Sequence, residues 1–316
     1  MVRFVSILAA HLFVVLTAPA FSQARVQEHR IAVLTPNAEI WPVINKALRS
    51  RGFVDGQNLL SDVRVGVPDQ LPMLARDLVA SKPDVIISVS SALGAVKAAT
   101  DVIPIVGFGP DPVEQGFAET HARPGGNVTG VAIFAADLDG KRLELLAEGT
   151  SGQHIAVLLN PTAQTASQIR RAVEQSARKL GIEPLLIDTS GPEEYPAAFA
   201  RLRAAGVRAL VITANSWFFR DREVLGGLAR EAGIVTMCEW AEMALSACTM
   251  GYGPQRPDLL DRVADQVARI LRGTHPRDIP IEQPTRFELV INANLAKAVG
   301  ATVSPSLFTR ADAVIE

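Results

Sequence analysis

Histidine and cysteine are scarce in this 316-residue sequence, which contains only five histidines and two cysteines. No histidine lies at metal-ligand spacing from another histidine or from a cysteine. The Asp-rich segment 137–140 resembles the start of a calcium loop, but it lacks the later ligands and the closing glutamate. We interpret it as a helix start and expect no metal site.

Motifs for cofactor binding and nucleophilic catalysis are also missing. The sequence has no P-loop and no Gly-x-Ser-x-Gly elbow. Gly107 and Gly109 are followed by Pro110-Asp111, and no third glycine opens a helix there, so a dinucleotide-binding fingerprint is not supported. We therefore expect no cofactor and no enzyme.

An excess of one charge is lacking as well. The formal net charge is −2, with acids and bases interspersed, whereas a nucleic-acid surface would show clustered Lys and Arg. After residue 21 no apolar stretch is long enough to span a bilayer.

The N-terminus has the pattern of a secretory signal peptide. Arg3 supplies a positive charge, residues 4–21 are almost entirely apolar, and small residues follow up to Ala24. We predict that residues 1–24 form a signal peptide cut after Ala24, with a cut after Ala20 as the second choice. The alternative is a membrane anchor, for which the run is short, since a span needs about 20 apolar residues. Cleavage would give a soluble periplasmic protein.

The rest of the chain is long for one hydrophobic core and suits two domains. Short runs of Val, Ile and Leu alternate with amphipathic segments from residue 29, and the pattern restarts after residue 150. This alternation predicts parallel sheets covered by helices on both faces, in two doubly wound α/β lobes. The expected strands are 30–34, 59–65, 84–89, 103–106, 154–159, 184–187, 207–213, 234–238 and 287–292.

The two cysteines lie near the ends of two expected strands. Cys238 ends one strand and Cys248 begins the next, with a short helical segment between them. In a parallel β-α-β unit these points lie at opposite ends of the strands, while a disulfide needs Cα atoms within roughly 7 Å. Export would permit a disulfide, but we expect two buried thiols.

Ligands of open α/β sheets bind outside the carboxyl ends of the strands. If two such lobes face each other, the residues just after each strand line the cleft between them. The segments in that position are 35–41, 88–93, 107–111, 160–165, 213–218 and 239–240.

Two neighbouring segments carry a specific resemblance. Residues 111–117 (Asp-Pro-Val-Glu-Gln-Gly-Phe) and 122–131 (Ala-Arg-Pro-Gly-Gly-Asn-Val-Thr-Gly-Val) resemble the signature of a family of ABC-transporter substrate-binding proteins that includes tryptophan-binding members. Further segments agree with the family in order and spacing, namely 52–58, 140–146, 251–254, 271–273, 279–292 and 310–312. The resemblance covers essentially the whole mature chain. It implies a type I periplasmic binding fold, in which hinge crossovers join two lobes that close on a ligand.

The resemblance also implies a function and partners. The protein would be the periplasmic solute-binding component of an ABC importer, holding a small polar ligand such as an amino acid or an aromatic carboxylate. Its partners would be that ligand and a permease in the inner membrane, with no nucleic acid, and it would be a monomer. We place lobe 1 at residues 25–131 and 250–280, and lobe 2 at residues 132–249 and 281–316. The turn 124–127 is expected to shape the hinge.

Charged ends of a ligand could meet groups on both lobes. Ser90 and Ser91 follow an expected strand and open a helix, so their hydroxyls and free N–H groups could clamp a carboxylate, or one of them could simply cap the helix. Glu239 follows a strand of the second lobe. By similarity to branched-chain amino-acid binding proteins it could pair with an ammonium, or it could be an acid favoured by a helix N-terminus. Glu242 is the fallback.

Seven further residues complete the candidate site. Trp41 could stack on the ligand or pack against Pro42. Asp111 could bind an ammonium or cap the turn at Pro112. An aromatic residue of the segment 217–219 could also stack on the ligand. The other candidates that follow strands are Asn37, Phe108, Asn215, Ser216 and Trp217.

Two other functions are alternatives for a two-lobed α/β chain. An isomerase or racemase on a two-lobed scaffold would need paired acid and base residues facing each other across the cleft, and no such pair follows facing strands. A ligand-sensing repressor would need a helix-turn-helix before the first lobe, where the signal peptide lies instead.

Overall fold

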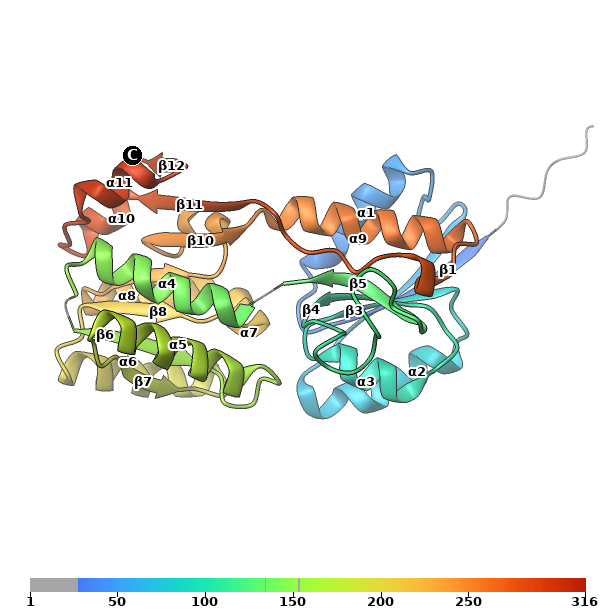
Figure 1. Cartoon of the computed structure of the whole chain (residues 1–316), viewed down its shortest axis with the longest axis horizontal. Coiled ribbons are helices and arrows are strands. Elements are labelled where there is room, and N and C mark those ends of the chain that lie inside the picture. Colours follow the sequence, from blue (N-terminus) through green and yellow to red (C-terminus); the bar gives the residue numbers. More distant parts are fainter. Residues whose placement is uncertain (1–27, 134, 153) are drawn as a thin grey trace, which may run out of the picture.

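The structure is a computed structural model that describes residues 28–133, 135–152 and 154–316. The signal peptide predicted at residues 1–24 lies outside the described residues. Two α/β lobes lie side by side along the long axis of the molecule (Figure 1). In the described part of the chain, no helix has both the length and the apolar character needed to cross a membrane.

The first lobe is built on five parallel strands in the order β2-β1-β3-β4-β5. Alternate residues of the central strand face opposite sides of this sheet. Ile31 and Val33 belong to the core with α1 and α9, while Ala32 and Leu34 belong to the core with α2 and α3. The elements are β1 (His29–Thr35), α1 (Ile40–Ser50), β2 (Leu59–Val65), α2 (Leu71–Ala80), β3 (Val85–Val89), α3 (Ala92–Ala99), β4 (Ile105–Gly109), β5 (Val128–Ala132) and α9 (Arg256–Leu271).

The second lobe is built on seven strands in the order β12-β11-β10-β9-β8-β6-β7, all parallel to their neighbours except for the antiparallel pair β10 and β11. Val157 of β6 packs with α4 and α5, and Leu158 packs with α6 and α8 on the other face. The strands are β6 (Ile155–Leu159), β7 (Leu185–Asp188), β8 (Ala209–Ile212), β9 (Val235–Cys238), β10 (Met250–Pro254), β11 (Phe287–Asn292) and β12 (Ala313–Ile315).

Helices of the second lobe cover both faces of that sheet. They are α4 (Ala135–Gly149), α5 (Ala166–Leu180), α6 (Tyr195–Ala204), α7 (Ser216–Arg220), α8 (Arg222–Ala232), α10 (Ala293–Ala298) and α11 (Pro305–Arg310). Short 3₁₀ helices lie at η1 (Pro68–Gln70), η2 (Pro192–Glu194), η3 (Ala241–Leu245) and η4 (Pro276–Asp278).

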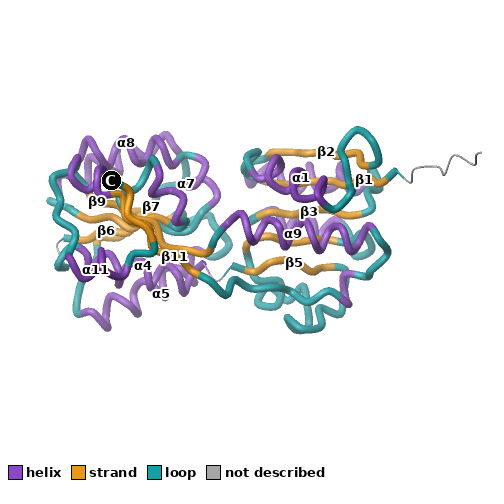
Figure 2. Tube along the Cα trace, turned by 90° about the horizontal axis from the view of Figure 1, so that it is seen from above, coloured by secondary structure: helices purple, strands orange, loops and turns teal. Residues whose placement is uncertain are grey.

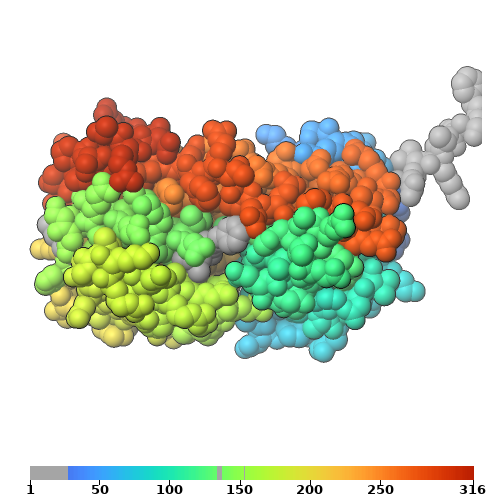
Figure 3. All heavy atoms as spheres, in the orientation of Figure 1, coloured from blue at the N-terminus to red at the C-terminus, as the bar shows by residue number. Residues whose placement is uncertain are grey.

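The described chain passes between the lobes after β5, after β10 and after η4 (Figures 1 and 2). The third passage pairs with the first: the N–H of Ala132 donates to the carbonyl of Glu282, and the N–H of Glu282 donates to the carbonyl of Gly130. Gly130 has φ +149°, and a Cβ there would lie 2.1 Å from the carbonyl oxygen of Gly107, so glycine is required. On the face shown in Figure 3, the orange to red-orange chain of the third passage runs from one lobe to the other.

The predicted fold class and the expected strands are confirmed, but one lobe boundary differs. We placed residues 250–280 in the first lobe, whereas β10 pairs with β9 and β11 in the second sheet. The second passage between the lobes therefore comes after β10, at Gln255, and not before it. A short apolar run predicts a strand without indicating which sheet it joins. The turn 124–127 precedes β5, and the side chain of Asn127 donates to the carbonyls of Thr100 and Ile103, which ties the turn to the start of β4.

Candidate functional site

A cavity of about 350 Å³ lies between the lobes, at the carboxyl ends of strands from both sheets. Its volume lies in the range of small-molecule sites. The first lobe contributes the residues after β1, β3 and β4, and the second lobe contributes the residues after β8 and β9 together with one face of α5. Lining residues include Thr35, Asn37, Ile40, Val89, Ser90, Phe108, Asp111, Ile133, Thr165, Ala214, Asn215, Ser216, Phe219, Glu239, Trp240 and Arg256.

Most of the candidate residues line this cavity, and three do not. Those in the cavity wall are Asn37, Ser90, Phe108, Asp111, Asn215, Ser216 and Glu239. Ser91 and Trp217 line a smaller pocket of about 50 Å³ that shares Ser90, Asn215 and Ser216 with the main cavity. Trp41 is half-buried and packs against the apolar core of the first lobe, where α1 covers the sheet.

Ser90 is less available for an anion than the sequence suggested. Its backbone has φ +54°, and its N–H donates to the carbonyl of Phe108 at 2.8 Å. The N–H expected to be free at this position is therefore already bonded, because the strained turn folds it back onto β4. Only the hydroxyl of Ser90 remains for a ligand.

Asn37 and Asp111 have side-chain oxygens that bond to their own turns. The Asn37 side chain accepts from the N–H of Glu39 at 2.9 Å. One Asp111 oxygen accepts from the N–H of Val113 at 2.8 Å, and the other lies 2.7 Å from Nε2 of His121. Asp111 is also buried. The two contacts hold its carboxylate in place before any ligand arrives.

Glu239 supplies a buried carboxyl group in the second-lobe wall. The residue is only 8% exposed. Burial raises the pKa of Glu239 from its ordinary 4.5 to about 8, with the cation of Arg142 opposing the rise and the nearby Asp139 adding to it. A cationic group that entered the cavity beside Glu239 would favour the ionised form.

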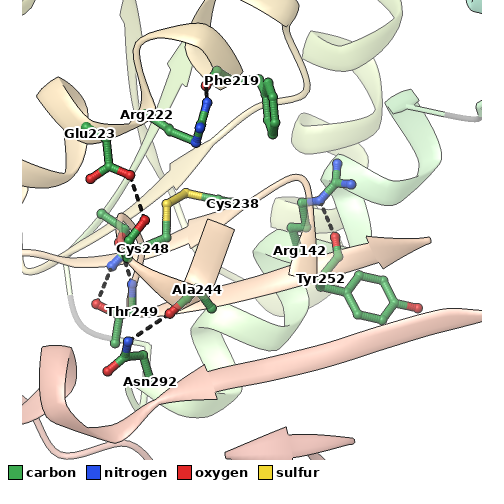
Figure 4. Close-up of a disulfide and its surroundings, with 12 residues drawn as sticks. Arg142, Phe219, Arg222, Glu223, Cys238, Ala244, Cys248, Thr249, Tyr252 and Asn292 are labelled. Carbon is green, nitrogen blue, oxygen red and sulfur yellow. Dashed lines mark hydrogen bonds between the residues drawn. A yellow bond between two sulfur atoms is a disulfide. The ribbon is translucent and has the colours of Figure 1, made fainter. Parts of the chain in front are cut away.

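An ion pair beneath this wall holds several of its segments together. Asp139 and Arg142 of α4 are 0% and 1% exposed, with Nη1 of Arg142 2.6 Å from Asp139. Arg142 also donates to the carbonyls of Glu239 and Tyr252, both at 2.8 Å, and the carboxylate of Asp139 accepts from the N–H of Ala214. Burial raises the pKa of Asp139, and Arg142 opposes that rise. The pair thus joins α4 to the residues that follow β8 and β9 and to the middle of β10, and Figure 4 shows the bond from Arg142 to Tyr252.

Arg256 and Phe219 line the cavity but were absent from the candidate residues. Arg256 is the first residue of α9 and follows β10 at the second crossover, and its Nε donates to Glu242 at 2.5 Å. Its guanidinium carbon lies 4.5 Å from the centre of the Phe219 ring. The rule that residues after strands line the cleft would have found Arg256, if β10 had been assigned to the second sheet. The aromatic segment 217–219 was noticed, but Phe219 and not Trp217 faces the main cavity.

Polar contacts join the lobes on both sides of the cavity. Arg222 of the second lobe lies 3.2 Å from Glu39 of the first lobe. On the other side, Gln115 bonds to Gln164 at 3.3 Å, and the side chain of Gln168 donates to Glu114 at 3.4 Å. The lobes are therefore in contact around the cavity.

Cys238 and Cys248 form a disulfide with Cα atoms 6.3 Å apart (Figure 4). The expectation of two buried thiols is wrong. It assumed that the end of one strand and the start of the next lie at opposite ends of the sheet. In the structure β9 and β10 pair over two residues only, so β10 begins level with the end of β9 and Cys248 remains near Cys238. Within residues 28–133, 135–152 and 154–316, no cluster of His, Cys, Asp and Glu is placed to hold a metal ion.

Comparisons with known proteins agree with this architecture. The family model described as ABC transporter substrate binding protein matches residues 37–315. A curated tyrosine-binding protein of Clostridioides difficile (strain R20291) is 26% identical over 260 residues, which are 80% of this chain and 74% of that protein.

Two solved structures show the same fold. A conserved domain protein of Vibrio cholerae O1 biovar El Tor has a TM-score of 0.82 at 22% identity, covering 91% of this chain and all of that one. An ABC domain from Streptococcus pneumoniae in complex with L-Trp has a TM-score of 0.80 at 19% identity, covering 92% of this chain and all of that one. The two lobes are those of a type I periplasmic binding fold.

Proposed function

The chain belongs to the family of ABC transporter substrate binding proteins, and from that premise we propose that it captures an amino acid with an apolar or aromatic side chain between its lobes. Membership of the family confirms a binding protein and not an enzyme. It also implies a small-molecule ligand and a membrane transporter as partners. The single observation that carries the proposal is the interlobe cavity, which is lined by the buried Glu239 of one lobe and by polar residues of the other.

The chemistry of the wall supports an amino acid. Glu239 would hold the ammonium group, because a cation restores the ionised form that burial disfavours. Phe108, Phe219 and Trp240 supply aromatic surface for a side chain. The C. difficile relative is named a tyrosine-binding protein, and the S. pneumoniae structure contains L-Trp. The two names and the aromatic wall together favour an aromatic amino acid.

The proposal extends to location and partner. We propose that residues 1–24 direct export and are removed, and that the mature chain is a periplasmic monomer. It would deliver its ligand to the permease of an ABC importer in the inner membrane. N-terminal sequencing of the exported protein should begin near Arg25, and an intact Met1 in a cytosolic fraction would contradict this part of the proposal.

Mass spectrometry of the ligand released from freshly purified, denatured protein tests the ligand directly. An aromatic or other apolar amino acid is the expected finding. Isothermal titration with the twenty standard amino acids then gives the affinity, and a ligand at about 100 times its Kd should add about 2.7 kcal/mol to the free energy of unfolding. Release of a sugar or a nucleoside, with no amino acid bound in titration, would overturn the proposal.

A further inference from the structure

The cavity wall contains two arginines, and they differ in burial. Arg171 is exposed on α5, whereas the side chain of Arg256 is only 14% exposed. The buried acids of the same wall are Asp111 and Glu239. An anionic group of a ligand would be repelled by the ionised form of either carboxyl group and attracted by Arg256.

The guanidinium of Arg256 is fixed in position but only partly bonded. Its Nε donates to Glu242, and its carbon lies 4.5 Å from the centre of the Phe219 ring. Within the described part of the chain, its two terminal nitrogens have no hydrogen-bond partner. A guanidinium presents its donors in a planar fork that matches the two oxygens of a carboxylate. Arg256 is therefore positioned in advance, with the donors for a bidentate bond still free.

Other groups of the wall offer less to an anion. The N–H of Ser90 is bonded to Phe108, which leaves one neutral hydroxyl there. Ser91 lies in the smaller pocket and does not line the main cavity. Hydrogen bonds between charged groups are roughly twice as strong as bonds between neutral ones. The serines are thus weaker anchors than a buried arginine.

We propose that Arg256 binds the carboxylate of the ligand, so that the anionic end of an amino acid is held at the second crossover and not by Ser90 and Ser91. This inference rests on the proposed function, since it requires a ligand with a carboxylate. Arg256 begins α9, which packs on the first lobe, while its partners Glu242 and Phe219 belong to the second lobe. The carboxylate then acts on the segment that joins the lobes.

The structure offers a matched control on the same aromatic ring. Arg222 places its guanidinium carbon 4.6 Å from the centre of Phe219, yet Arg222 does not line the cavity. Arg222→Gln removes a cation from Phe219 just as Arg256→Gln does. Only the second change removes a cation from the cavity wall.

The test compares two ligands that differ by a carboxylate, L-tyrosine and tyramine, with L-tryptophan and tryptamine as a second pair. Isothermal titration gives both affinities for the wild-type protein, Arg256→Gln, Arg222→Gln and the double variant Ser90→Ala/Ser91→Ala. We expect the wild type to prefer the amino acid by roughly 30-fold or more. Arg256→Gln should reduce that preference to about threefold or less, while Arg222→Gln and the double serine variant retain it. A purely structural role of Arg256 would weaken both ligands equally.

Each outcome decides the inference. If Arg256→Gln keeps the full preference, the inference is overturned while the proposed function stands, and loss of preference in the serine variant would place the carboxylate on the first lobe. If the wild type binds no amino acid and neither amine, the proposed function fails and the inference with it. Should Arg256→Gln not fold, Arg256→Lys provides the readout, because it keeps the charge but loses the fork. The preference should then fall without vanishing, and an unchanged preference would contradict the inference.

Discussion

The two walls of the cavity hold their polar groups in different ways. On the first-lobe side, Asn37 and Asp111 bond to backbone N–H groups two residues further along their own turns. On the second-lobe side, Arg142 bonds to carbonyls that lie 97 and 110 residues away in the sequence. The first wall is fixed by local turns, and the second is assembled from distant segments around a buried charge. The second wall should therefore be the more sensitive to a single substitution.

Arg142→Met gives the largest expected effect. The change leaves Asp139 as an unpaired buried carboxyl group, and breaking a buried pair in this way costs about 3–5 kcal/mol. Urea denaturation at neutral pH measures that loss in the free energy of unfolding. The matched control in the first lobe is Arg51→Met, which breaks a bidentate ion pair with Asp261. The side chain of Asp261 is 57% exposed. An exposed pair contributes about 1 kcal/mol or less. Equal losses in the two variants would remove the contrast between the lobes.

The disulfide of the second lobe should give the next largest effect. It closes the segment that contains Glu239, Trp240 and Glu242, and the two cysteines have a sequence separation of 10. In the chain-entropy model a loop of this length contributes roughly 3 kcal/mol. Replacing Cys238 and Cys248 together by Ala should lower the free energy of unfolding by about that amount, as measured by denaturation in urea.

Ligand affinity should fall in the same double cysteine variant, because Glu242 holds Arg256 and both depend on the closed segment. The first lobe contains no cysteine, so a reductant can break only the disulfide of the second lobe. A variant with wild-type stability and affinity would show that the segment is held by its other contacts, such as the bond from Asn292 to the carbonyl of Ala244.

The contrast between a wall fixed by local turns and a wall assembled from distant segments also explains how much of the site could be predicted from the sequence. The rule that ligands bind after parallel strands placed Asn37, Asp111 and Glu239 in one region, because each follows a strand that its own apolar run revealed. Arg256 was missed because its strand was given to the wrong lobe. The sheet that a strand joins depends on contacts between distant segments, which a single sequence does not display.

The buried pair of α4 shows a second limit. Asp139 and Arg142 are three residues apart, and so are Lys141 and Glu144 on the same helix. Lys141 and Glu144 are 43% and 31% exposed, whereas Asp139 and Arg142 are buried. Spacing alone makes both pairs look like surface ion pairs. Only the packing of α4 against the ends of β8 and β9 and against β10 distinguishes the two pairs.

Glu239→Gln tests whether the buried acid of the second wall titrates as its surroundings require. The pKa of Glu239 is about 8 in the folded protein, above its ordinary 4.5, so the folded chain binds this proton more tightly than the unfolded chain does. The group therefore contributes most stability in acidic solution, and that contribution is lost as the pH rises through about 8. Between pH 6 and pH 8 the ligand-free wild type should lose on the order of 2 kcal/mol relative to Glu239→Gln. Urea denaturation at pH 6, 7 and 8 measures the difference.

Ligand binding should depend on pH in the opposite direction. A ligand ammonium beside Glu239 favours the ionised carboxylate, so binding below pH 8 must release the proton that Glu239 carries. Affinity for an amino acid should then rise by up to roughly tenfold per unit between pH 6 and pH 8. Glu239→Gln should bind more weakly and lose this slope, whereas Glu114→Gln, a change at an exposed carboxylate of the same cavity, should keep it. Titrations in buffers of different ionisation enthalpy would count the proton. Parallel pH profiles for the wild type and Glu239→Gln would place the ammonium elsewhere, and the charge contrast between the two walls would then rest on Arg256 and the pair of α4.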